Sequence, residues 1–144
     1  MTCSKQSTLV LLTTAVVLLD SRSVSAGAGS LTFFKGTNFN TEDGYYKFGI
    51  RWPQECYNIS AAFNDNVSSV KWEGLVQSGA FDGHAKVALY TGADCSGTVL
   101  SWPTTESNFP TNLALDGIDD QLSSFMIWKA NKDAREGISR KFLR

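Results

Sequence analysis

The chain has 144 residues, of which 42% are hydrophobic, 12% aromatic and 19% charged. This composition is that of one compact globular domain and excludes collagen-like, low-complexity and disordered chains. A net charge of −1 with a single histidine excludes a general nucleic-acid binder with a basic surface, and sites built from several imidazoles.

Residues 1–26 are predicted to form a secretory signal peptide. Lys5 precedes the uncharged stretch Leu9–Leu19, and small residues suited to cleavage follow at 24–26 and 26–28. A membrane anchor is the alternative, but the stretch is much shorter than the roughly 20 apolar residues that span a bilayer. We therefore expect a secreted, extracellular protein with no transmembrane segment.

Charge is unevenly distributed over the rest of the chain. Residues 27–128 carry eleven acidic and five basic side chains, whereas the tail 129–144 carries six basic and two acidic ones. The acidic body favours binding of a cation. A basic tail without a sustained apolar face is typical of a solvated terminus, and contact with an anionic lipid or a partner is the alternative.

Cysteine usage agrees with secretion. Cys3 belongs to the predicted signal peptide, so Cys56 and Cys95 remain as a pair, and a disulfide is the expected state in an oxidising compartment. A catalytic thiol would need a base, and the only histidine, His84, lies in a sequence typical of a turn. Two sequons, at Asn58 and Asn66, predict a glycoprotein.

Short alternating or β-branched runs separated by Gly, Asn and Asp clusters predict an all-β body. A turn is expected at Gly79–Gly83, and another at Thr41–Gly44. The expected strands are Leu31–Phe34, Tyr45–Ile50, Val67–Trp72, Val87–Tyr90, Thr98–Trp102 and Leu122–Trp128.

The body repeats itself. Leu31–Phe34 matches Val87–Tyr90 at an offset of 56 residues, and the hexapeptide 64–69 (NDNVSS) matches 119–124 (DDQLSS) at an offset of 55. Two copies of one four-strand unit predict an eight-strand sandwich. The copies span about 30–74 and 85–128, within a domain of residues 27–128.

The two hexapeptides are the candidate metal-binding motifs. Each offers carboxylate, amide and hydroxyl oxygens, which Ca²⁺ prefers, without a nearby thiol or imidazole to suit zinc or copper. One such hexapeptide alone would be interpreted as an Asx-turn, whereas two at equivalent positions favour a metal. Neither has the glycine and twelfth-position glutamate of an EF-hand.

This paired pattern, with each copy opened by an aromatic strand and a tight hairpin, resembles a microbial-type βγ-crystallin domain. The resemblance covers about residues 30–128 and implies a βγ-crystallin-like sandwich of two four-stranded Greek-key motifs. It also implies two Ca²⁺ per chain, each held by oxygens of one hexapeptide and a hydroxyl of the other. The implied ligand positions are Asn64, Asp65, Asn66 and Ser68 of the first copy, Asp119, Asp120, Gln121 and Ser123 of the second, and backbone oxygens of Lys35 and Thr91.

The chain departs from the family pattern in its hairpins. Cys95 stands in an aromatic place, and Thr41 stands where a glycine is expected. We expect a cost of roughly 1 kcal/mol or more at Thr41, because a positive φ disfavours residues with a Cβ. A glycan on Asn66 would crowd the first site, so we expect that site to be unglycosylated or impaired.

The expected function is a secreted, non-enzymatic calcium-binding module in which the ion stabilises the fold. The alternative is a secreted protease inhibitor, toxin or effector that binds an extracellular protein or a microbial or host surface through the same scaffold. The segment Trp102–Leu113 is the candidate presenting surface, and an ordinary connecting loop is equally consistent with it. An enzyme is not expected, because the sequence has no Gly-rich phosphate loop and no Gly-x-Ser-x-Gly elbow.

Overall fold

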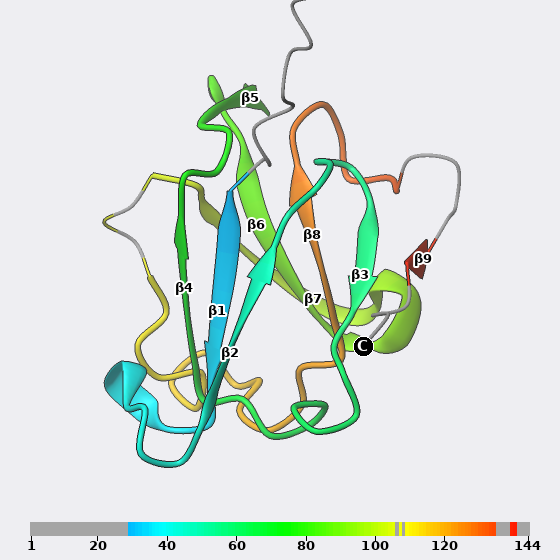
Figure 1. The fold of residues 1–144 in the computed structure, drawn as a ribbon. Coiled ribbons are helices and arrows are strands. Elements are labelled where there is room, and N and C mark those ends of the chain that lie inside the picture. The colour runs from blue at the N-terminus through cyan, green and yellow to red at the C-terminus, as the bar shows by residue number, and fades with distance from the viewer. Residues whose placement is uncertain (1–28, 106, 108, 135–138, 141–144) are drawn as a thin grey trace, which may run out of the picture.

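The computed structural model describes residues 29–140, except 106, 108 and 135–138. The predicted signal peptide and much of the basic tail therefore lie outside the described residues. The described part of the chain contains no helix with the length and hydrophobicity that a membrane crossing requires. It forms two β-sheets that face each other (Figure 1). The elements in chain order are β1 Ser30–Phe34, η1 Thr37–Phe39, β2 Tyr45–Gly49, β3 Cys56–Asn58, β4 Ser69–Glu73, β5 Ser78–Phe81, β6 Lys86–Gly92, η2 Ala93–Cys95, β7 Ser96–Pro103, β8 Ser124–Trp128 and β9 Ser139–Arg140.

The two halves of the chain exchange strands between the sheets. The smaller sheet has the order β2-β1-β4, and the larger has the order β7-β6-β8-β3-β9. Strand β3 of the first half thus pairs with β8 of the second, in antiparallel register. Such a crossing connection is the mark of a Greek key, and the predicted all-β sandwich is confirmed.

The second half in turn adds the segment 110–113 to the smaller sheet. The Val70 N–H donates to the Pro110 carbonyl at 3.1 Å, and the Leu113 N–H donates to the Ser68 carbonyl at 2.8 Å. This segment therefore occupies the fourth position of the smaller sheet without forming a regular strand. The end of Trp102–Leu113 is thus hydrogen-bonded to β4, and use of this segment as a presenting surface stays a prediction.

The core lies between the sheets, because alternate residues of each strand point inward. Leu31 and Phe33 of β1 meet Phe125 and Ile127 of β8, and all four side chains are buried. The Phe33 and Phe125 ring centroids are 5.1 Å apart. Burial of each such side chain contributes roughly 1.5–3 kcal/mol, so this interface holds the two halves together.

The predicted disulfide is confirmed. Cys56 of β3 is bonded to Cys95 of η2, with a Cα–Cα distance of 5.9 Å. A second link, which the sequence analysis missed, lies beside it. Asn58 Nδ2 donates to Asp94 Oδ1 and the Asp94 N–H donates to Asn58 Oδ1, both at 2.7 Å. The covalent and polar links both join the two halves.

The described part of the basic tail is attached to the body. Gln54 Oε1 accepts hydrogen bonds from the N–H groups of Lys129 and Ala130, and its Nε2 donates to the Asp133 carbonyl at 2.8 Å. Strand β9 then pairs in parallel with β3. The backbone of the described tail is thus held by the body, whereas residues 129–133 are exposed, so a solvated tail stays a prediction.

Some boundaries differ from the predicted ones. Strand β4 begins at Ser69, not Val67, because Val67 and Ser68 use their backbone to bind other segments. Strand β3 was not predicted, and the expected turn at Gly79–Gly83 includes part of β5, which bridges to His84. These strands are too short for their periodicity to be recognised.

Candidate metal centre

The two hexapeptides face each other and make reciprocal backbone contacts. The Asp65 N–H donates to the Leu122 carbonyl at 3.2 Å, and the Asp120 N–H donates to the Val67 carbonyl at 3.3 Å. Asp65 and Asp120 both adopt the left-handed conformation, with φ of 54° and 51°, which aspartate tolerates better than most residues. The sequence repeat is thus a repeat of geometry.

The sixth residue of each hexapeptide, Ser69 or Ser124, is fully buried and fixes its own hairpin. Each hydroxyl donates to one backbone carbonyl of the hairpin and accepts from one backbone N–H. The bonds are Ser69 Oγ to Gly36 O (2.6 Å), Phe39 N to Ser69 Oγ (3.1 Å), Ser124 Oγ to Gly92 O (2.6 Å) and Cys95 N to Ser124 Oγ (2.9 Å). These serines are therefore structural.

The fifth serine of the second hexapeptide reaches across to the first. Ser123 Oγ donates to Asp65 Oδ1 at 3.2 Å. Ser123 and its counterpart Ser68 are each only 8% exposed. The structure therefore brings together a carboxylate of one copy and a hydroxyl of the other, which is the combination that the βγ-crystallin resemblance implies for one ion.

Each fifth serine also lies beside the start of its own hairpin. The Ser68 N–H donates to the Phe34 carbonyl and the Ser123 N–H donates to the Tyr90 carbonyl, both at 2.9 Å. Lys35 and Thr91 follow these aromatic residues directly in the chain. The two expected backbone ligands thus follow residues that are hydrogen-bonded to the fifth serines.

The second hexapeptide holds carboxylates in an unfavourable setting. Asp119 Oδ1 is buried and is without a hydrogen-bond partner within the described chain. Burial raises the pKa of the Asp120 carboxyl above its ordinary value, and the neighbouring Asp119 carboxylate raises this pKa further. A cation at this place would supply the missing partner and offset the repulsion.

The donor set fits a hard cation. Among the described residues, no three His, Cys, Asp or Glu side chains gather as metal ligands, so a site here would depend on single carboxylates, hydroxyls and backbone carbonyls. That set suits Ca²⁺. Five of the expected residues are exposed: Asn64, Asp65, Asn66, Asp120 and Gln121. Asn64 Nδ2 donates to Asp65 Oδ2 at 3.0 Å.

The prediction of backbone strain at Thr41 is wrong. Thr41 does not have a positive φ, and Gly44, with φ of 107°, takes that conformation nearby. In the second hairpin Gly97 has φ of 78°, and a Cβ there would lie 2.7 Å from Thr91 Oγ1. The longer loop of the first hairpin moves the glycine requirement to another residue.

The cysteine at position 95, where the family pattern has an aromatic residue, leaves the hairpin conformation unchanged. Phe39 and Cys95 occupy equivalent places and both have positive φ, 61° and 54°. Each also donates its N–H to the sixth serine of its copy. Replacement of the aromatic residue by cysteine therefore preserves the turn and supplies one half of the disulfide.

Comparison with known proteins finds no matching family model and no matching curated protein. Similar solved structures are βγ-crystallin domains. The first comes from a study of the evolution of the eye-lens βγ-crystallin domain fold. It is 21% identical, and the match covers 74% of this chain and 92% of that chain with a TM-score of 0.48. A second is a domain of the Abundant Perithecial Protein of Neurospora crassa in its Ca²⁺-bound form (18%, 72% and 92%, TM-score 0.47), and a third comes from an archaeon (19%, 69% and 96%, TM-score 0.46).

The fold is βγ-crystallin-like. This follows from the strand exchange between two sheets and the repeated hairpins, and at these identities the likeness to solved structures concerns the fold only. The domain boundary expected after Trp128, the end of β8, stays a prediction, because β9 of the tail pairs with β3 in the larger sheet.

Proposed function

We propose that the chain is a secreted, non-enzymatic protein that binds Ca²⁺ at the paired hexapeptides of its βγ-crystallin-like domain, and that the ion stabilises the fold. The contact of Ser123 Oγ with Asp65 Oδ1 supports this proposal most directly. It joins a buried hydroxyl and a carboxylate from the two halves at the place where the repeat makes reciprocal backbone bonds. Two equivalent sites give an expected two ions per chain.

Oxygen atoms of both hexapeptides and of the hairpins would hold the ions. Asp65 and Asp120 would supply carboxylate oxygens, Ser123 and Ser68 hydroxyl oxygens, and the hairpins backbone carbonyls. Bound Ca²⁺ supplies positive charge that offsets carboxylate repulsion and links the two halves. Since a ligand that binds only the folded state stabilises it, Ca²⁺ at a hundred times its Kd would add about 2.7 kcal/mol to the free energy of unfolding.

Secretion is supported by the predicted signal peptide and by the disulfide, which forms and persists in oxidising compartments. The sequons at Asn58 and Asn66 belong to the same proposal. Expression of the full chain in a secreting host tests it. The mature protein should appear in the medium with its N-terminus near residue 27, and retention of the first 26 residues would contradict it.

Calorimetric titration with CaCl₂ tests the binding site. The disulfide-bonded protein should bind two ions. Ser123→Arg should abolish at least one site, because the new side chain would fill the place of the ion with its own cation. Ser107→Arg, at an exposed serine in the connecting segment, is the matched control and should leave the titration unchanged. Equal loss in both variants, or no heat in the wild type, would refute the proposed site.

A further inference from the structure

A cavity of about 570 Å³ lies on the outer face of the smaller sheet, and no hexapeptide residue lines it. This volume is within the range of roughly 300–1,000 Å³ that is typical of small-molecule sites. The cavity is lined by outward-facing side chains of β1, β2 and β4, together with neighbouring aromatic residues.

Two lysines flank a threonine on the floor of this cavity. In the antiparallel register, Thr32 of β1 lies opposite Lys47 of β2 on one side and Lys71 of β4 on the other. Directly opposed side chains have Cβ atoms about 4.5–5.5 Å from their neighbour. The two lysine side chains therefore start on either side of one threonine.

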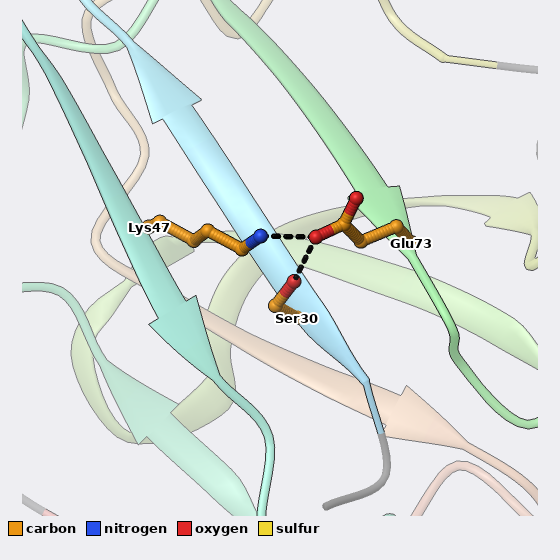
Figure 2. Close-up of polar contacts among 3 residues, drawn as sticks. All are labelled: Ser30, Lys47 and Glu73. Carbon is orange, nitrogen blue, oxygen red and sulfur yellow. Dashed lines mark hydrogen bonds and ion pairs between the residues drawn. The ribbon is translucent and has the colours of Figure 1, made fainter.

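The two lysines have different partners. Figure 2 shows the Lys47 ammonium reaching across β1 to the Glu73 carboxylate, which also accepts a hydrogen bond from Ser30 Oγ at 3.4 Å. The Lys71 ammonium instead lies over the Phe34 ring, 5.2 Å from its centroid. Within the described chain no carboxylate is at ion-pair distance from Lys71. The cavity thus carries one positive charge in excess.

The next row of the sheet is aromatic. Tyr45 lies opposite Phe34 in the register, and the two rings stack with centroids 5.9 Å apart. Tyr45 is 56% exposed, so it presents an aromatic surface to solvent beside the lysine row. A ring that packs on this surface would bring its substituents over Thr32.

The equivalent face of the larger sheet is closed by the chain itself. There the repeat places Ala88 between Met126 and Ser101. Ala88 and Met126 are buried with Trp128, and Phe81 and Ala134 pack against them. The cationic, aromatic row is therefore specific to the smaller sheet and is not required by the fold.

We propose that this cavity binds a terminal uronic acid residue of a glycan. The carboxylate would lie over Thr32 between Lys47 and Lys71, where charge-assisted hydrogen bonds are strong. The pyranose ring would pack on Tyr45, and its hydroxyls would match Glu73 and the hydroxyl groups of the cavity. A purely hydrocarbon acid would leave these polar groups facing an apolar edge.

The test is an NMR titration of the disulfide-bonded protein, in calcium and in chelator, with methyl glucuronoside, methyl glucoside and acetate at constant ionic strength. We expect saturable shifts of the Thr32 and Lys71 amides with methyl glucuronoside, and affinities for the neutral glycoside and for acetate that are lower by about tenfold or more. Equal binding of acetate would reduce the cavity to a general anion site and overturn the proposal.

Two variants locate the binding. Lys71→Gln should lower the affinity for methyl glucuronoside about tenfold and leave that for methyl glucoside unchanged. Lys86→Gln, at a lysine over the Phe81 ring on the other sheet, is the matched control and should bind like the wild type. Equal loss in both variants, or no saturable shift in the wild type, would refute the assignment. The result is independent of calcium binding, because the cavity shares no residue with the hexapeptides.

Discussion

The sixth serines of the hexapeptides should be more important for stability than for calcium. Ser69→Ala or Ser124→Ala removes one hydroxyl and leaves a backbone carbonyl and a backbone N–H of the hairpin without their bonds. Each unsatisfied buried group costs about 1–3 kcal/mol. Since each variant leaves two such groups, the expected loss is about 2–6 kcal/mol, or a fall in Tm of roughly 10 °C or more.

Urea unfolding in the presence of chelator measures this loss without a contribution from the ion. Ser96→Ala is the control, because Ser96 Oγ donates to the Ala93 carbonyl in the same hairpin but is exposed. It should change the free energy of unfolding by less than about 0.5 kcal/mol. If Ser69→Ala and Ser124→Ala are no more destabilising than Ser96→Ala, the assignment of the sixth serines to hairpin support is wrong.

Three further outcomes are expected. The double variant Cys56→Ser/Cys95→Ser should lose about 4 kcal/mol in urea unfolding, from the entropy of a loop closed over a separation of 39 residues, and an unchanged midpoint would contradict this. Tyr57→Phe should flatten the fall in stability at high pH, because burial raises the pKa of the Tyr57 phenol above 10.0. The contribution of this phenol to the free energy of unfolding is therefore complete below pH 10.0 and is lost as the pH rises through the higher folded-state pKa. Urea midpoints at pH 8 and above pH 10 that shift equally in both proteins would refute this. Asn58→Ala should cost about 1–2 kcal/mol through its two bonds with Asp94, and calorimetric unfolding at the wild-type Tm would show that this link is not stabilising.

The repeat made much of the fold predictable. The match of Leu31–Phe34 with Val87–Tyr90 predicts equivalent strands, and β1 and β6 are both inner strands, β1 between β2 and β4 and β6 between β7 and β8. Strand β3 escaped prediction because three residues show no periodicity and its position depends on pairing with β8, a partner distant in sequence. Boundaries near Val67 were wrong for a similar reason, since long-range backbone bonds decide where β4 begins.

The candidate metal centre was predictable in residue type but not in arrangement. The two hexapeptides could be recognised from their spacing, whereas the different uses of adjacent serines depend on side-chain direction in the folded state. Ser123 reaches Asp65, while Ser124 binds the hairpin. The outer cavity gave no sequence signal, because Lys47 and Lys71 meet only through the strand register.

Thermal unfolding of the mature, disulfide-bonded protein in chelator and in excess calcium tests the central claim most directly. Calcium at a hundred times its Kd should add about 2.7 kcal/mol to stability and raise the Tm of the wild type. The increase should be lost or reduced in Ser123→Arg and retained in Ser107→Arg. A wild-type Tm that is the same in chelator and in calcium would show that the hexapeptides are structural turns and would contradict the proposed function.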